Sequence, residues 1–186
     1  MTQRLPAGVS LTKLETHHDH RGSLTEIFRV GWIDPDASPA QWNFTVSEAG
    51  VLRGVHLHLS HTDYLVVAEG RADIGLRDVR RGSPTDGLAT IVAMNAEEPS
   101  ALTIPPGVIH GLHFRERSIV LYGLSEEWDL ADDLACRWDD PDVGIPWGVT
   151  SPTISERDAG APSLRDLLAA VEHAQPIGGA SEPSAS

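Results

Sequence analysis

The chain has 186 residues, a single cysteine and a formal net charge of -13 at pH 7. A duplex nucleic-acid binder presents a basic face, so this composition argues against a nucleic-acid partner. One cysteine excludes an intramolecular disulfide and a thiolate metal cluster. No segment approaches the roughly 20 consecutive apolar residues of a membrane span. We therefore expect a soluble, cytoplasmic protein with no membrane contact.

Short strands are predicted along most of the chain, spaced about ten residues apart and separated by Gly, Pro, Asp and Ser. A strand at 9–14 and a second at 23–30 flank a predicted turn at 17–22, and 34–39 is predicted as a loop. Further strands are predicted at 41–46, 51–59, 64–68, 72–79, 90–94, 101–104 and 118–124, with 110–114 lying between the last two. No long helical period occurs before residue 160, so the pattern predicts an all-β sandwich or barrel.

The C-terminal part has a different pattern. Ser163 and Asp166 fit a capping box in which Asp takes the place of the usual Glu. Apolar residues then recur at helical spacing from Leu164 to Val171, which predicts one helix of about ten residues packed on the β-domain. Residues 1–175 are predicted to form a single domain. Residues 176–186 contain almost only Gly, Ala, Ser and Pro, and we expect them to form a disordered tail.

Several candidate functional residues lie in the stretch from Gly50 to Gly70. His56 and His58 are two positions apart on an apolar run, so a strand would direct both imidazoles to the same face. Arg53 lies an odd number of residues from His56, and a regular strand would place it on the opposite face. Gly54 between them can bend or bulge the strand and so bring both side chains to one pocket.

Two chemistries fit this stretch together with His110, which follows a tight Pro-Gly turn. Imidazoles beside an arginine suit proton transfer next to an anion, and they also suit a metal ion. The spacing resembles the two motifs of the cupin superfamily, whose metal-binding members place two His, one Glu and a final His there. The matching set is His56, His58, Asp63 and His110, which would suit Fe(II), Mn, Ni or Zn.

A longer resemblance covers about residues 15 to 160. Its segments, in order, are Asp19-His-Arg21-Gly-Ser-Leu-Thr-Glu26-Ile-Phe28-Arg29, Gln41-x-Asn43, Gly50-Val-Leu-Arg53-Gly-Val-His56, Asp78-Val-Arg80-Arg-Gly-Ser83-Pro84-Thr85, Ile104-Pro-x-Gly107-x2-His110-Gly111, Tyr122-x2-Ser125, Trp138-x-Asp140-Pro141-x2-Gly144-Ile145-x-Trp147 and Ile154-Ser155-x2-Asp158. Together they resemble the dTDP-4-dehydrorhamnose 3,5-epimerase family, a branch of the cupins. The resemblance implies a jelly-roll β-sandwich, no cofactor or metal, and a homodimer in which N-terminal strands pair across the interface.

The resemblance also implies roles for individual residues in the epimerisation of a dTDP-4-keto-6-deoxysugar at C3, C5 or both. His56 matches the general base that removes a proton alpha to the ketone, and Asp158 matches the carboxylate that orients it. Tyr122 matches the general acid that returns a proton to the other face. The positions that match substrate-binding residues are Arg21, Glu26, Gln41, Asn43, Arg53, Tyr64, His110 and Trp128. Arg21 and Arg53 would contact the diphosphate, because a guanidinium binds phosphate oxygens in pairs.

Three positions depart from the family pattern. Aligned by the following Leu-Val, Tyr64 stands where the family has a lysine that stabilises the enolate, a kind of interaction worth several kcal/mol. His58 replaces a usual Gln, and Trp128 replaces a common Tyr. Two other interpretations therefore remain open. One is a metal-dependent cupin oxygenase or isomerase, and the other is a protein that binds a nucleotide-sugar without catalysis.

Overall fold

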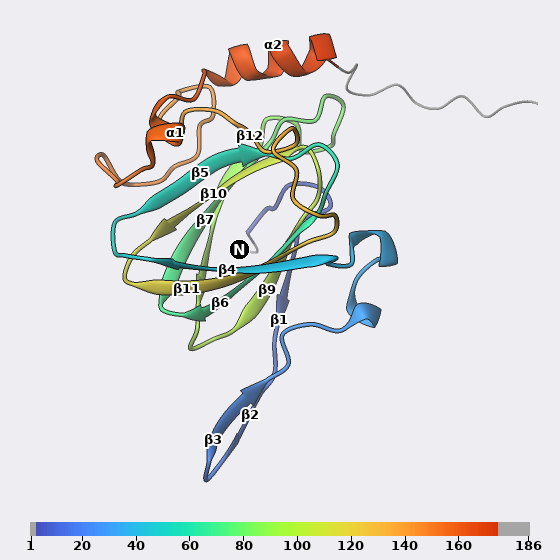
Figure 1. Ribbon diagram of the computed structural model, residues 1–186, viewed down its shortest axis with the longest axis vertical. Helices are drawn as coiled ribbons and strands as arrows, with labels where there is room; N and C mark the ends of the chain where they lie inside the picture. The colour runs from blue at the N-terminus through green and yellow to red at the C-terminus, as the bar shows by residue number, and fades with distance from the viewer. Residues whose placement is uncertain (1–2, 175–186) are drawn as a thin grey trace, which may run out of the picture.

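The computed structural model describes residues 3–174, which form two five-stranded antiparallel sheets and a separate hairpin (Figure 1). The strands are β1 (Ser10–Lys13), β2 (Thr16–Asp19), β3 (Gly22–Thr25), β4 (Gln41–Ser47), β5 (Leu52–Leu57), β6 (Asp63–Glu69), β7 (Arg71–Asp78), β8 (Ala89–Asn95), β9 (Ser100–Ile104), β10 (Val108–Phe114), β11 (Ser118–Leu124) and β12 (Leu134–Ala135). One sheet has the order β1-β9-β6-β11-β4 and the other has the order β12-β5-β10-β7-β8. The predicted jelly-roll sandwich is confirmed.

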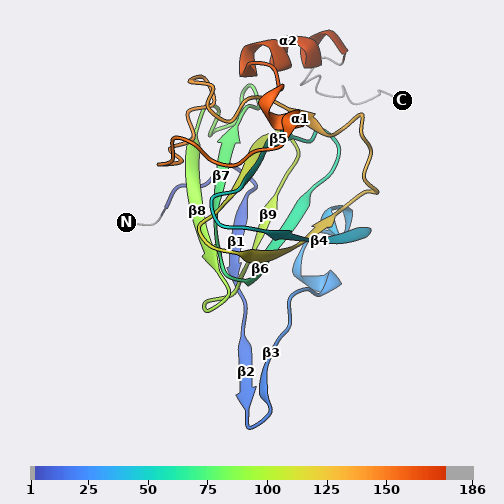
Figure 2. The same ribbon diagram turned by 60° about the vertical axis from the view of Figure 1, so that its left-hand side comes forward.

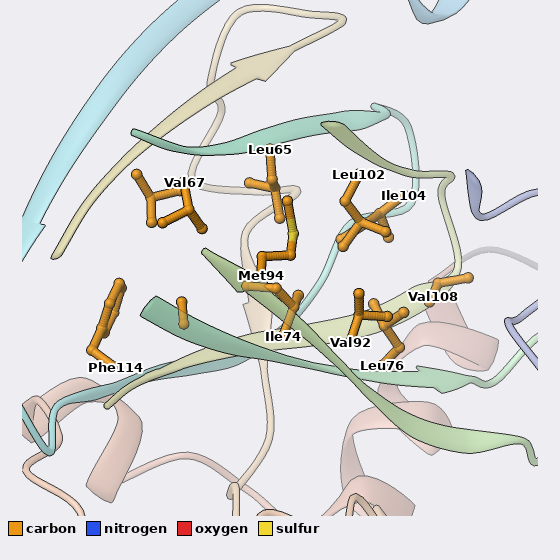
Figure 3. Packing of buried hydrophobic residues seen from close by; sticks show 12 residues of the cluster. Leu65, Val67, Ile74, Leu76, Val92, Met94, Leu102, Ile104, Val108 and Phe114 are labelled. Carbon is orange, nitrogen blue, oxygen red and sulfur yellow. The ribbon is translucent and has the colours of Figure 1, made fainter. Parts of the chain in front are cut away.

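Apolar side chains from both sheets fill one part of the space between them (Figure 3). Strand alternation explains which residues take part, because every second residue of β7 and β6 points inward. The buried members of this cluster are Leu65, Val67, Ala72, Ile74, Leu76, Val92, Met94, Leu102, Ile104, Val108, Phe114 and Val120. Burying one side chain of this size contributes about 1.5–3 kcal/mol, so this cluster accounts for much of the fold's stability.

The outer face of the second sheet is covered by the C-terminal part of the chain. The α-helices are α1 (Glu156–Ala159) and α2 (Leu164–Ala174), and only α2 was predicted. Ser163 and Asp166 form the expected cap, with the Asp166 amide donating to Ser163 Oγ at 3.1 Å. Leu164, Leu167 and Val171 are buried against β5 residues and the 136–147 segment, as the helical spacing predicted. Neither helix is long and apolar enough to cross a membrane within residues 3–174.

The N-terminal region differs from the prediction. Residues 17–22 were expected to form a turn and 23–30 a strand, but β2 and β3 form a hairpin that extends away from the sandwich (Figures 1 and 2). After Thr25 the chain turns back, and two short 3-10 helices follow, η1 (Val30–Trp32) and η2 (Pro35–Ala37). Ile27 and Phe28 break the strand because they pack on the outer face of the first sheet. The predicted tail at 176–186 lies outside the described residues.

Candidate active site

A cavity of about 490 Å3 occupies the rest of the space between the sheets. Its walls come from β4, β5, β6, β10 and β11, together with the 125–133 loop and the start of α1. The lining residues are Thr45, Val51, Leu52, Arg53, His56, His58, His61, Asp63, Leu65, His110, Leu112, Tyr122, Leu124, Trp128, Asp133, Thr153, Ile154, Ser155, Arg157 and Asp158. The volume is typical of a small-molecule site.

An irregularity in β5 brings two predicted residues to this cavity. The register between β5 and β10 shifts where His110 pairs with His56 but Gly111 pairs with Gly54. Gly54 has φ +102°, and a Cβ there would lie 3.0 Å from the His110 carbonyl oxygen, so the position requires glycine. Because of the extra residue, Arg53 and His56 both line the cavity despite their odd spacing. The expected effect of Gly54 is confirmed.

His56 is held by a carboxylate on its Nε2 side. Nε2 lies 3.1 Å from Asp158 Oδ1, and Asp158 Oδ2 accepts a hydrogen bond from Ser155 Oγ at 2.9 Å. Burial alone would raise the pKa of Asp158, but the hydrogen bonds from His56 and Ser155 outweigh it and hold that pKa below its ordinary value. An ionised carboxylate on Nε2 fixes the imidazole as an Nε2–H donor and leaves Nδ1 as the basic nitrogen.

A second carboxylate, not anticipated from the sequence, lies on the other side of the ring. Asp133 Oδ1 is 3.8 Å from His56 Nδ1, and Asp133 Oδ2 accepts from Arg157 Nη1 at 2.6 Å. Burial opposes ionisation of Asp133, yet the Arg157 hydrogen bond and nearby His56 keep its pKa lowered. A proton taken up by His56 Nδ1 would thus be stabilised by carboxylates on both sides.

Tyr122 and Arg53 line the cavity from different sheets. Tyr122 lies on β11, and burial raises the pKa of its phenol, so the hydroxyl remains protonated at neutral pH. Within residues 3–174 that hydroxyl makes no hydrogen bond. Arg53 Nε donates to Ser47 Oγ at 2.8 Å, which directs the guanidinium toward the β4 side of the cavity. The Tyr122 hydroxyl and the Arg53 guanidinium are therefore both available to contact a ligand in the cavity.

Three imidazoles surround Asp63 at one end of the cavity. His58 Nε2, His61 Nε2 and His110 Nε2 lie 4.0, 3.8 and 3.8 Å from Asp63 Oδ2. Burial raises the pKa of Asp63, and burial lowers the pKa of His58 and of His110 to about 4, so these two imidazoles are neutral at pH 7. Of the predicted metal set, the structure gathers His58, Asp63 and His110, whereas His56 is not part of the group.

Asp132 fastens the loop after β11 to the turn after β5. Its carboxylate accepts from the amides of Leu59 and Ser60 at 2.7 and 3.3 Å, from Ser60 Oγ at 2.7 Å and from His61 Nδ1 at 2.9 Å. Its carbonyl oxygen also accepts from His58 Nδ1 at 3.0 Å. One residue of the loop therefore orients two of the buried histidines.

Several predicted substrate-binding residues lie away from the cavity in a single chain. Tyr64 does not line it, contrary to the prediction, because alternation along β6 directs Asp63 and Leu65 inward and Tyr64 outward. The Tyr64 hydroxyl instead donates to the Ile27 carbonyl at 2.8 Å, and its ring packs against two aromatic neighbours. On β6, Asp63 is the residue that faces the cavity beside His110.

The N-terminal candidates are also remote from it. Arg21 pairs with Asp19 at the tip of the β2–β3 hairpin, and Glu26 pairs with Arg29. Gln41 is connected to the cavity through Trp128, whose amide donates to the Gln41 side-chain oxygen at 2.9 Å. Gln41 Nε2 also donates to Asn43 Oδ1 at 3.1 Å. Arg53, His110 and Trp128 line the cavity as predicted.

Comparison with known proteins decides the family. The family model described as dTDP-4-dehydrorhamnose 3,5-epimerase matches residues 5–166. The chain belongs to the dTDP-4-dehydrorhamnose 3,5-epimerase family. A relative of that name from Sinorhizobium fredii is 30% identical over an alignment 176 positions long, and the match covers 87% of this chain and 87% of the relative. The family consists of nucleotide-sugar epimerases and has the cupin fold.

Two solved structures of epimerases superpose closely on this family member. The rmlC epimerase of Mycobacterium tuberculosis gives a TM-score of 0.82 at 28% identity and covers 89% of this chain and 88% of its own. ChmJ, a 3'-monoepimerase from Streptomyces bikiniensis in complex with dTDP-quinovose, gives a TM-score of 0.79 at 28% identity. The match covers 96% of this chain and 100% of the ChmJ chain. A structure named as an rmlC epimerase and one named as a 3'-monoepimerase thus share this fold.

Proposed function

We propose that this chain epimerises a dTDP-4-keto-6-deoxysugar, with His56 as base and Tyr122 as acid. The observation that carries the proposal is the pairing of His56 Nε2 with Asp158, which leaves Nδ1 basic and at the cavity. His56 Nδ1 removes the proton alpha to the ketone, and Asp158 and Asp133 stabilise the resulting imidazolium. The protonated phenol of Tyr122 then returns a proton to the enolate from the other face, which inverts the carbon.

The substrate class is supported by the comparisons and by the charges in the cavity. One similar structure holds dTDP-quinovose, and the family model carries the name of a dTDP-sugar epimerase. Arg53 lines the cavity of this chain and suits a diphosphate, because guanidinium groups bind phosphate oxygens in pairs. Trp128, about half exposed at the cavity, offers a ring on which a base or sugar can stack.

A homodimer is part of this proposal. Arg21 and Glu26 lie on or next to a hairpin that extends away from the chain's own cavity (Figure 2), so they can contact a nucleotide-sugar only in a second copy. The edge strand β4 is a suitable contact surface, because it exposes three large apolar side chains, those of Trp42, Phe44 and Val46. We also place the enzyme in the cytoplasm, with which the free, buried Cys136 is compatible.

Deuterium wash-in tests the proposal. In D2O the wild type should incorporate deuterium at C3, C5 or both of dTDP-4-keto-6-deoxyglucose, and His56→Asn should abolish incorporation, whereas Tyr122→Phe should permit proton removal but slow inversion. His173→Asn on the exposed face of α2 is the matched control and should behave as wild type. Exchange retained in His56→Asn would remove His56 as the base. A wild type that binds dTDP in calorimetry yet exchanges no deuterium would be a binding protein instead.

A further inference from the structure

The three imidazoles around Asp63 share one orientation. His58 Nδ1 lies 3.0 Å from the Asp132 carbonyl, His61 Nδ1 lies 2.9 Å from the Asp132 carboxylate, and His110 Nδ1 lies 3.4 Å from the Val108 carbonyl. Each of these partners is an oxygen that can only accept, so Nδ1 carries the hydrogen in every ring. The three Nε2 atoms therefore carry lone pairs, and all three face Asp63 Oδ2.

Among residues 3–174, Asp63 has no hydrogen-bond donor that satisfies this arrangement. Its side chain is buried, yet no hydrogen bond reaches its carboxylate from residues 3–174. The separations of 3.8–4.0 Å exceed hydrogen-bond length, so no imidazole bonds directly to it. His61 Nε2 is fully buried and has no hydrogen-bond partner within the described part of the chain. Nitrogen and oxygen lone pairs that converge on one point beside the cavity are the arrangement that a bound cation would satisfy.

We propose that His58, Asp63 and His110 bind a divalent transition metal ion, with His61 placed to approach as a fourth ligand. The ligand atoms of the first three lie within 4.8 Å of one another. Zinc binds imidazole nitrogen and carboxylate oxygen at about 2.0–2.2 Å, so an ion at the centre of the group needs only a small inward movement of the side chains. Imidazole ligands favour zinc or iron(II) over Mg2+ or Ca2+, which take oxygen ligands.

Each imidazole also has the partner that metal-binding histidines usually have. A ligating histidine typically donates its other N–H to a carboxylate or a backbone carbonyl, which fixes the ring and its tautomer. His58 and His61 do so through Asp132, and His110 does so through Val108. The cavity next to the group leaves room for water or another ligand to complete the coordination.

The site is separate from the proposed base. His56 pairs with Asp158, and its ring centroid is 6.4 Å from that of His58. The metal set thus differs from the one suggested by sequence spacing, because His56 is not part of it. Metal binding and proton abstraction by His56 are compatible, and the metal proposal stands independently of the epimerase proposal.

Metal binding by the untagged full chain tests this proposal. After treatment with a chelator, calorimetric titration with Zn2+ should show about one equivalent bound, and Zn2+ should raise the unfolding temperature, since it binds only the folded state. Asp63→Asn should weaken Zn2+ binding at least 100-fold, whereas its metal-free form should unfold at the same or a higher temperature. The double variant His17→Ala/His18→Ala, on the exposed hairpin, controls for adventitious surface binding and should match wild type.

X-ray absorption at the zinc edge of the wild type gives a measurement that needs no variant. Two or three imidazole nitrogens and one carboxylate oxygen in the first coordination shell would support the site. The proposal is overturned if the wild type binds no zinc, if Asp63→Asn binds it with wild-type affinity, or if His17→Ala/His18→Ala abolishes binding. A zinc shell with fewer than two imidazoles would overturn it as well.

Discussion

The space between the two sheets has an apolar part and a polar part, and the same strands contribute to both. On β6, Val67 packs in the apolar cluster while Asp63, four residues away on the same face, lies among the histidines. On β10, Phe114 and His110 show the same contrast. Strand alternation therefore fixes which residues point inward, whereas the position along the strand decides whether they stabilise the fold or act on a ligand.

Two buried carboxylates illustrate the difference. Asp78, at the end of β7, is completely buried and accepts hydrogen bonds from Arg80, Ser83 and Thr85. Asp63 is buried but has no hydrogen-bond partner among residues 3–174. A carboxylate that is fully hydrogen-bonded holds a turn in place, whereas one that lacks partners is available to bind something. Four variants test the contrast between structural and functional parts of the interior.

The largest effect is expected from Asp158→Asn. The amide cannot stabilise a protonated His56 and no longer fixes its tautomer, so kcat/KM for epimerisation should fall by about 10^2- to 10^4-fold. Steady-state kinetics with a dTDP-4-keto-6-deoxysugar measure the loss. Asp139→Asn, a carboxylate at the surface paired with Arg137, is the matched control and should retain activity. A loss of less than tenfold in Asp158→Asn would contradict the assigned role.

Phe114→Ala should have the largest effect on stability. Phe114 is fully buried in the apolar cluster, and removal of its ring should lower the free energy of unfolding by about 3–5 kcal/mol. Urea unfolding followed by circular dichroism measures the change. Leu130→Ala provides the contrast, because Leu130 is 66% exposed and its truncation should change stability by no more than about 0.5 kcal/mol. Equal effects of the two variants would refute the packing described for this cluster.

Asp78 should make stability depend on acid pH. Burial alone would raise the pKa of Asp78, but hydrogen bonds from Arg80, Thr85 and Ser83 outweigh it and lower that pKa well below its ordinary value. Because the folded-state pKa is the lower one, the ionised carboxylate stabilises the fold above about pH 4, and this stabilisation is lost as pH falls further. Asp78→Asn should therefore cost about 1–3 kcal/mol at pH 7 and progressively less as the pH is lowered below about 4. Urea midpoints across that range are the measurement, and a penalty that does not change with pH would exclude this explanation.

Among the variants of the sheet interior whose unfolding is measured, Tyr122→Phe is expected to have the smallest effect on stability. The hydroxyl makes no hydrogen bond to residues 3–174, so its removal should change the free energy of unfolding by less than about 1 kcal/mol. The measurement is the same urea titration that is used for Phe114→Ala. A clear destabilisation would show that the hydroxyl supports the fold and would weaken its assignment as a catalytic acid.

The sandwich itself could be predicted from the sequence because its signals are local. Alternation along 72–79 and the break at Gly70 describe one strand and its turn, and the period from Leu164 to Val171 describes one helix. The shared face of His56 and His58 follows from the same alternation. Most of β3 was correctly predicted, but the strand was extended too far, since the outward packing of Ile27 and Phe28 depends on residues of the first sheet.

The site was predicted less completely because much of it depends on distant pairings. Asp132 contacts residues more than 70 positions earlier, and no motif or period marks Asp132 or Asp133 in the loop. Tyr64 was placed in the pocket because the following Leu-Val aligned it with a lysine of the family. Alternation along β6, however, makes Asp63 and Tyr64 face opposite sides of the sheet. Family resemblance therefore identified His56, Asp158 and Tyr122 as candidates, but it could not decide which residue of β6 faces the ligand.

The hydrogen bonds of Asp132 provide a way to measure how often the loop beside the cavity opens. Its carboxylate accepts from the amides of Leu59 and Ser60, so these hydrogens are shielded from solvent as long as the loop after β11 stays fastened. Exchange at these two amides therefore reports the opening frequency of that loop, independently of global unfolding. The hydrogen-exchange rates of these two amides can therefore be used to follow access to the cavity in the absence of a substrate.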